Sequence, residues 1–426
     1  MNTTPPPHLS AALRRRAAAV ADTITAALAA PWPVEFGDDF RPDSPRWRNQ
    51  SLSKGAAGVA VLHGVRAQHG HGDMTAVHAW LTRATGDGLS AGDGAGLWFG
   101  APALAFALHT AAPGHYRRAL ARLVLAVDDL IDTRLEAAAE RMRAARRPSQ
   151  YEFDLTRGLT GLGAHLLRRD PGSERLGRVL TYLVRLTRPV PADDAAGLRA
   201  PGWWTADLPA RPLHDAAFAD GHANLGTAHG ITGPLALLSL AMRQGVTVDG
   251  HREAIDTICR HLDTWQQTSP AGPWWPERLT LDELKTGRCR PEGPARPSWC
   301  YGTPGIARAQ QLATLALGDT ARQHAAEDAL AHCLADPRQL ARITDPALCH
   351  GWAGVIATAW HAAADAATPR IAQHLNQILR HFLDHTHGLP HQAHPGLVEG
   401  SAGVALTLHT VATGTTGSWP TCLLIC

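Results

Sequence analysis

A glycine motif recurs seven times along the 426-residue chain, and this repetition limits the folds that the chain can adopt. Each copy begins with Gly-x-x-Gly, or with Gly-x-x-Ala in the second copy, and continues into a run rich in alanine, leucine and valine. The first glycines of the copies are Gly55, Gly100, Gly158, Gly230, Gly302, Gly351 and Gly400. Their spacing of 45 to 72 residues is typical of repeats that each contain a pair of helices and the adjoining loops.

The repeats predict an all-α fold. Glycines at i and i+3 lie on one face of a helix start and let neighbouring backbones approach closely. The nearly all-apolar runs fit inner helices, and the more polar segments between them fit outer helices. We therefore predict a double-layered α/α toroid with seven inner and seven outer helices. An open superhelix is the alternative, but it needs polar capping repeats, which neither terminal copy resembles.

We expect residues 1–426 to form one toroid domain with long loops near residues 186–214 and 266–299. Both loops are rich in proline and tryptophan. Loops of this length in a compact protein are usually functional or disordered. The tryptophans fit either an exposed rim that binds a peptide or a packed loop.

Composition excludes several classes of function. A net charge of +2 gives no electrostatic basis for binding nucleic acid, and no apolar run approaches the ~20 residues of a membrane span. The cysteines number seven, and an odd number in a long chain favours a reducing compartment and metal or thiol roles. The basic start "LRRRAAAVADTITAALAA" is interrupted by polar residues. We therefore predict an amphipathic first helix there, and not a signal peptide.

Cys300 and Cys349 occupy the same position in successive copies, two residues before the first glycine. His350 directly follows Cys349. Because equivalent repeat positions should occupy equivalent places, we expect both thiols to converge beside this imidazole. Two thiolates and one imidazole suit tetrahedral zinc and leave a fourth position open for water or substrate, whereas soft ligands argue against magnesium or calcium. The alternative is that both cysteines are small buried residues at helix starts.

His229 occupies the position of His350 two copies earlier in the chain. Across a ring it can face the metal without binding it, and a histidine titrating near neutrality suits proton transfer to or from a bound substrate; the alternative is a histidine that caps a helix or packs in the core. Asp154 precedes Gly158 by four residues. This aspartate could orient a histidine or pair with its charge, and the alternative is a helix N-cap.

Four segments, "NLGTAHGITGP", "WCYGTPG", "LCHGWAG" and "GLVEGSAG", resemble in this order the signature segments of the lanthionine synthetase C-like family. The resemblance covers nearly the whole chain and implies an α/α toroid with a zinc site. It implies the zinc ligands Cys300, Cys349 and His350. It also implies the active-site residues His229, Asp154, Arg296 and Tyr301.

The resemblance implies a lanthipeptide cyclase, a carbon–sulfur bond-forming enzyme of the lyase class. A cysteine thiol of a dehydrated precursor peptide adds to dehydroalanine or dehydrobutyrine in the same peptide and forms a thioether ring. Zinc would supply this thiol as a thiolate. His229 would protonate the resulting enolate, and Asp154 would tune or orient it.

The expected partners are the dehydrated precursor peptide, a separate dehydratase and a transporter. The expected location is the cytoplasm, either free or on a membrane-bound biosynthetic complex. Two alternatives stay open. One is a zinc-dependent thiol transferase that uses glutathione or a similar thiol. The other is a non-catalytic scaffold that binds the precursor peptide.

Overall fold

The computed structural model describes residues 9–31, 49–86, 88–191, 197–209, 216–386 and 394–426. These residues contain seventeen α-helices. The chain divides into two compact units. The first unit comprises Met1–Leu130 and Ile343–Cys422, and the second comprises Ile131–Arg342 and Leu423–Cys426. That the two units act as one domain stays a prediction.

Every copy of the glycine motif starts a helix, as predicted from the sequence, at its first glycine or within two residues after it. We call these helices the core helices. They are α3 (Ala56–Gln68), α5 (Gly100–Ala111), α8 (Leu159–Arg169), α10 (Thr232–Arg243), α13 (Thr303–Leu317), α16 (Trp352–Asp365) and α18 (Ser401–Thr413). They are buried nearly all round: in α16 every residue from Trp352 to Ala362 is buried. Helices that are apolar on all sides require such burial.

Seven helices that are more polar than the core helices lie before the first motif copy and in the intervals between the copies. We call them the cover helices. They are α1 (Ala11–Ala27), α4 (Met74–Thr85), α6 (Arg117–Arg143), α9 (Glu174–Leu186), α11 (His251–Trp265), α14 (Thr320–Ala335) and α17 (Arg370–Asp384). In α17, Ile371, Leu375, Ile378 and Phe382 recur at helical spacing and are all buried. The predicted amphipathic first helix is α1, which is capped by Ser10.

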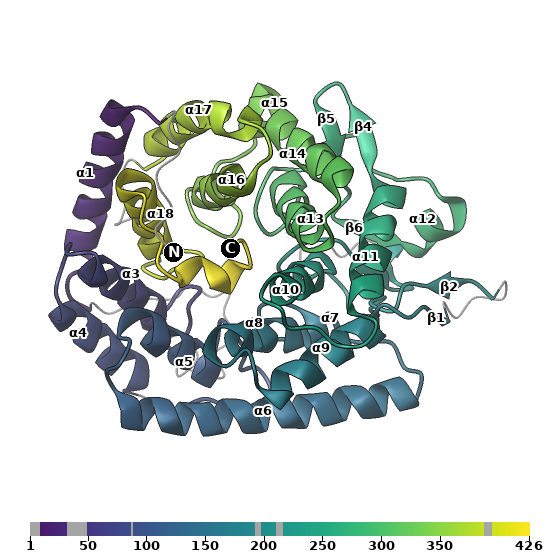
Figure 1. The fold of residues 1–426 in the computed structure, drawn as a ribbon, viewed down its shortest axis with the longest axis horizontal. Coiled ribbons are helices and arrows are strands. Elements are labelled where there is room, and N and C mark those ends of the chain that lie inside the picture. Colours follow the sequence, from purple (N-terminus) through teal and green to yellow (C-terminus); the bar gives the residue numbers. More distant parts are fainter. Residues whose placement is uncertain (1–8, 32–48, 87, 192–196, 210–215, 387–393) are drawn as a thin grey trace. The chain divides into compact units, whose positions relative to one another are not determined.

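Within each unit, core helices pack on core helices and on their own cover helices (Figure 1). In the first unit, α18 packs on α1, α3 and α16, α3 also packs on α4 and α5, and α16 packs on α17. In the second unit, α10 packs on α8 and α13, and the pairs α8–α9, α10–α11 and α13–α14 are in contact. Three short helices, α7 (Gln150–Phe153), α12 (Leu281–Thr286) and α15 (Pro337–Leu340), complete the set in the described residues.

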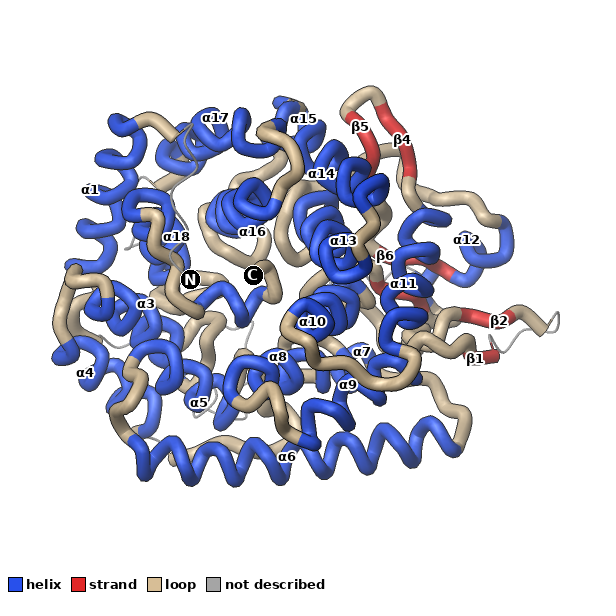
Figure 2. The backbone as a smooth tube through the Cα atoms, in the orientation of Figure 1, coloured by secondary structure: helices blue, strands red, loops and turns tan. Residues whose placement is uncertain are grey.

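The strands in the described residues are short and form three two-stranded antiparallel sheets (Figure 2). The pairs are β1 (Val190–Pro191) with β2 (Arg199–Ala200), β3 (His222–Asn224) with β6 (Arg278–Thr280), and β4 (Gln267–Ser269) with β5 (Gly272–Trp274). All but β3 lie in the two segments predicted as long loops. The second long loop therefore folds back through β6 onto the segment that leads to α10.

The tryptophans of the two long loops are packed and do not form an exposed rim. Trp203, Trp204 and Trp299 are at most 1% exposed, and Trp274 and Trp275 are also buried. The sequence left open an exposed rim or a packed loop for these tryptophans, and the structure shows the packed loop.

Backbone hydrogen bonds join the motif copies of the first unit just ahead of their first glycines, and one of them joins the seventh copy to the first. The amide of Cys349 donates to the carbonyl of Val398 at 2.9 Å, and Val398 donates to Leu52 at 3.2 Å. The amide of Leu52 in turn donates to the carbonyl of Trp98 at 2.9 Å. The prediction that equivalent repeat positions occupy equivalent places is thus confirmed within this unit.

The last residues of the chain, Leu423–Cys426, belong to the second unit. Two buried side chains of that unit hold their backbone: Trp299 Nε1 donates to the carbonyl of Leu423 and Arg308 Nε to that of Ile425, both at 3.0 Å. Among the described residues, no helix combines the length and the apolar character that a membrane crossing requires.

Candidate active site and metal ligands

Three motif segments of the second unit are held together by their backbones. The amide of Leu155 donates to the carbonyl of Ala228 at 3.1 Å, and the amide of Thr227 donates to the carbonyl of Cys300 at 2.9 Å. Leu155 and Ala228 adjoin Asp154 and His229, Thr227 lies two residues before His229, and Cys300 is itself a predicted site residue. The unit therefore carries Asp154, His229, Cys300 and Tyr301 on one hydrogen-bonded framework.

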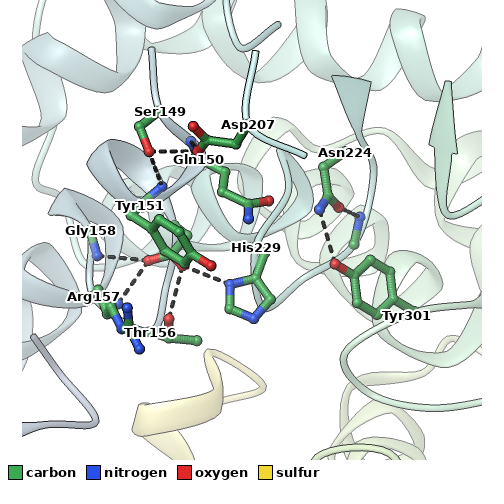
Figure 3. A network of polar contacts seen from close by, with 12 residues as sticks. Ser149, Gln150, Tyr151, Thr156, Arg157, Gly158, Asp207, Asn224, His229 and Tyr301 are labelled. Atoms are coloured by element: carbon green, nitrogen blue, oxygen red, sulfur yellow. Dashed lines mark hydrogen bonds and ion pairs between the residues drawn. The ribbon is translucent and has the colours of Figure 1, made fainter. Parts of the chain in front are cut away.

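Asp154 is fully buried and accepts four hydrogen bonds; its partners Thr156, Arg157, Gly158 and His229 are labelled in Figure 3. Its Oδ1 accepts from the backbone amides of Arg157 and Gly158, each at 2.7 Å. Its Oδ2 accepts from the Thr156 hydroxyl at 2.8 Å and from His229 Nδ1 at 2.7 Å. One carboxylate oxygen thus fixes the turn before α8, and the other binds the histidine.

The contact with Asp154 determines the chemistry of the His229 ring. Because the carboxylate accepts, Nδ1 carries a proton and the neutral ring keeps its lone pair on Nε2. His229 has 34% of its side chain exposed, whereas Asp154 is 0% exposed. The ring can therefore meet a substrate while its buried partner keeps the tautomer fixed, an arrangement suited to general acid–base chemistry.

Tyr151 and Arg157 contact this pair and were not foreseen from the sequence. The Tyr151 ring meets the His229 ring edge-on, with 6.3 Å between centroids. The Arg157 guanidinium lies 5.0 Å from the centre of the Tyr151 ring. Tyr151 is 43% exposed, so an aromatic surface flanks the histidine.

Cys300 is 4% exposed and lies in the turn before α13. Its Sγ is 3.5 Å from the Ser298 hydroxyl. Gly302 ends the turn with φ of 92°, a conformation that favours glycine. Gly226 packs against this turn. A Cβ added there would lie 2.6 Å from ring carbons of Tyr301 and 2.7 Å from the Cys300 carbonyl oxygen.

Tyr301 is partly buried, and its hydroxyl accepts two hydrogen bonds. Asn224 Nδ2 donates to Oη at 2.9 Å, and Arg278 Nη2 donates at 2.8 Å. The Arg278 guanidinium also lies 4.7 Å from the ring centre. Burial raises the pKa of Tyr301 to about 12, although the Arg278 charge and the Asn224 hydrogen bond oppose this rise.

Arg296 lies four residues before Cys300 in the same loop and is partly exposed. Its Nε is buried and has no hydrogen-bond partner among the described residues. A buried donor without a protein partner is one that a bound substrate can satisfy.

Cys349 and His350 lie in the first unit, in the loop before α16, and both are partly exposed. A ligand atom of each side chain lies within 4.8 Å of the other. His350 Nε2 is 3.4 Å from Asp345 Oδ2, and Asp345 Oδ1 accepts from the amide of Ala347 at 2.6 Å. A carboxylate of the same loop therefore orients the imidazole. Such partners are usual for metal-binding histidines.

Of the sequence-predicted residues, the structure brings Asp154 and His229 into direct contact. Sequence reasoning missed the residues that hold the predicted ones. Asn224 lies within the quoted "NLGTAHG" segment and could have been considered. Arg278 comes from the second long loop, and only the pairing of β3 with β6 reveals its place.

The family profile described as lanthionine synthetase C-like protein matches residues 46–424. Nisin biosynthesis protein NisC of Lactococcus lactis subsp. lactis is 30% identical over 137 residues. That match spans about a third of each protein, 32% of this chain and 32% of the relative. The solved structure of nisin cyclase superposes with a TM-score of 0.71 at 18% identity, over 98% of both chains.

The structural likeness confirms the predicted fold class, an all-α α/α toroid. The match to the profile extends over most of the chain and includes every motif segment that carries a predicted site residue. The chain is therefore a member of the lanthionine synthetase C-like protein family.

Proposed function

We propose that the protein is a zinc-dependent lanthipeptide cyclase. It would add cysteine thiols of a precursor peptide to dehydroalanine or dehydrobutyrine of the same peptide and form thioether rings. The observation that carries the proposal is the 2.7 Å contact between His229 Nδ1 and the buried Asp154. The segment of His229 is in turn hydrogen-bonded to the backbone carbonyl of Cys300 through the amide of Thr227. Family membership and the likeness to nisin cyclase support it.

The zinc ligands that we propose are Cys300, Cys349 and His350. The two cysteines hold the same position in successive motif copies, and successive copies are joined at this position within each unit. Their donor set of two sulfurs and one nitrogen fits zinc and leaves one position for a substrate. The contact of Asp345 with His350 supports a metal-binding role for this imidazole.

A bound zinc would lower the pKa of a substrate thiol and supply it as a thiolate. The residues of the chain handle the remaining charges and protons. His229 takes up a proton at the Nε2 lone pair, from the substrate thiol or from water, and the resulting imidazolium delivers this proton to the α-carbon after the thiolate has added to the β-carbon. Asp154 keeps the proton of Nδ1 in place and stabilises the imidazolium. Arg296 offers its buried Nε to the bound peptide.

The proposed substrate is a dehydrated precursor peptide, so a separate dehydratase must act first. A transporter would export the product. We propose that the enzyme acts in the cytoplasm, free or on a membrane-bound complex, because an odd number of cysteines, seven, in a long chain favours a reducing compartment.

The test uses a synthetic peptide that contains one dehydroalanine and one cysteine. After incubation with the protein, thiol alkylation and mass spectrometry count the cysteines that remain, and a reaction without protein gives the background rate. Cyclisation above background supports the proposal. Transfer of added glutathione onto the peptide instead would identify a thiol transferase, and peptide binding without either reaction would identify a scaffold.

A further inference from the structure

The hydroxyl of Tyr301 has both of its lone pairs engaged by the protein. Arg278 and Asn224 each donate a hydrogen bond to Oη. Among the described residues, no acceptor lies within hydrogen-bond distance of this hydroxyl. A phenol donates one hydrogen and accepts at its oxygen, so the donor function of Tyr301 is the part that remains for a ligand.

The orientation of the Asn224 amide is fixed independently of Tyr301. The amide of Gly226 donates to Asn224 Oδ1 at 2.9 Å, which turns Nδ2 toward the phenol (Figure 3). Asn224 is fully buried. Its side chain cannot rotate the oxygen toward Tyr301 without leaving the buried amide of Gly226 unpaired, which is energetically costly.

The short sheet of β3 and β6 brings the two donors together. Asn224 and Arg278 are register partners across this sheet, and the amide of Leu225 extends the pairing with a hydrogen bond to the carbonyl of Glu277 at 2.9 Å. The second long loop therefore delivers a cation to the tyrosine that follows Cys300. This contact gives the second long loop a role in the site, because the loop places Arg278 on Tyr301.

We propose that Tyr301 donates a hydrogen bond to the carbonyl oxygen of the dehydroamino acid, and that Arg278 and Asn224 are positioning residues for this contact. The inference rests on the proposed function. As the sulfur lone pair forms the bond to the β-carbon, the electrons of the double bond move toward the α-carbon and the carbonyl oxygen. Tyr301 stabilises the charge on that oxygen, and its own O–H bond stays intact.

Fixed donors directed at a developing oxyanion commonly contribute about 10²–10³-fold in rate. Arg278 and Asn224 contribute indirectly: while both donate to Oη, the hydrogen cannot be turned toward either of them.

The decisive variants are Tyr301→Phe and Asn224→Asp. Tyr301→Phe removes the donor and should slow single-turnover cyclisation of the dehydrated test peptide about 10²-fold. Asn224→Asp keeps the size of the side chain and an acceptor for the amide of Gly226, but its carboxylate accepts the Tyr301 hydrogen. It should cause a similar loss although the tyrosine is present. Arg288→Gln, an exposed arginine of the same loop, is the matched control and should keep the parent rate.

A spectroscopic measurement tests, without any activity assay, whether Arg278 and Asn224 both donate to Tyr301 Oη. The chain has four tyrosines, so the Tyr301 signal in the tyrosine doublet of ultraviolet resonance Raman spectra can be assigned by subtracting the Tyr301→Phe spectrum. We expect an acceptor-type hydroxyl in the parent and a strong donor in Asn224→Asp. A parent hydroxyl that already behaves as a strong donor would show that Arg278 and Asn224 do not hold Tyr301 Oη as an acceptor, and would overturn the proposal.

Different results would refute the proposed cyclase function and the proposed role of Tyr301. If the parent protein does not cyclise the peptide, the proposed function fails, and the Raman result alone decides whether the hydroxyl is held as a donor for a ligand. If the parent cyclises and Tyr301→Phe matches its rate, the role of Tyr301 is overturned. Circular dichroism and zinc content of each variant exclude a folding defect; if Tyr301→Phe misfolds, Asn224→Asp decides.

Discussion

Replacing Asp154 with asparagine should invert the tautomer of His229 and leave the fold intact. The amides of Arg157 and Gly158 both donate to Oδ1 at 2.7 Å, so the oxygen of the new amide must stay there. The NH₂ group then takes the position of Oδ2, 2.7 Å from His229 Nδ1. Two donors cannot face each other, so His229 must move its proton from Nδ1 to Nε2, where the substrate meets the ring.

The expected effect is large. An imidazole held in the wrong tautomer by this type of substitution loses about 10⁴-fold in turnover, which corresponds to about 5 kcal/mol in the barrier. Asp154→Ala would be a poorer test, because two buried backbone amides would lose their acceptor at about 1–3 kcal/mol each. Thr156→Val is the matched control. It removes one hydrogen bond to the same Oδ2 but leaves the carboxylate on His229, so its loss should stay within about tenfold.

The assay is single-turnover cyclisation of the test peptide, with zinc content measured on the same samples. We expect Asp154→Asn to keep its zinc, since the four hydrogen bonds that Asp154 accepts come from Arg157, Gly158, Thr156 and His229, none of which is a proposed zinc ligand. Cyclisation within threefold of the parent would refute the tautomer reasoning. Loss of zinc together with activity would instead make Asp154 a support of the metal site.

Three further outcomes are expected. The double variant Cys300→Ala, Cys349→Ala should lose its zinc in elemental analysis; full zinc content would show that the ligands are misassigned. Asp345→Asn should weaken zinc binding about 10–100-fold in competition with a chelator, because it loses the carboxylate that contacts His350; unchanged affinity would remove Asp345 from the site. Gly226→Ala should destabilise the protein by about 1–3 kcal/mol in urea and slow cyclisation, whereas Gly177→Ala, on the open face of α9, should not destabilise it; equal stability of the two variants would contradict the close packing on Tyr301.

The repeat explains how much of the fold the sequence predicts. Glycine spacing and apolar runs are local signals, and they predicted all seven core helices and the cover helices between them. The β3–β6 pairing carries no such signal: Asn224 and Arg278 are register partners, but they lie in segments separated by a core helix and its cover helix. Contacts that depend on how a long loop folds back cannot be predicted from periodicity.

In the candidate site, too, the residues near the repeated glycines were predictable and the residues that hold them were not. His229 and Asp154 were predictable because each lies close to the first glycine of a copy, one and four residues before it, and the backbone hydrogen bond from Leu155 to Ala228 joins these segments. The residues that hold the site side chains were not. Thr156 holds the repeat position of Cys300 and Cys349, but a threonine there carries no chemical signal of its own. Tyr151 and Asp345 lie farther from the first glycine of their copies, where the sequence alignment of the copies gave no expectation.

His229 and His350 occupy the same repeat position, immediately before a first glycine, yet opposite ring nitrogens are anchored. His229 is held through Nδ1 by Asp154, which turns Nε2 outward for proton transfer. His350 is contacted through Nε2 by Asp345, which makes Nδ1 the nitrogen that we expect to bind zinc. The repeat thus supplies an imidazole at one position, and the neighbouring carboxylate decides which chemistry it performs. A variant that moved the carboxylate would change the role of the histidine without moving its backbone.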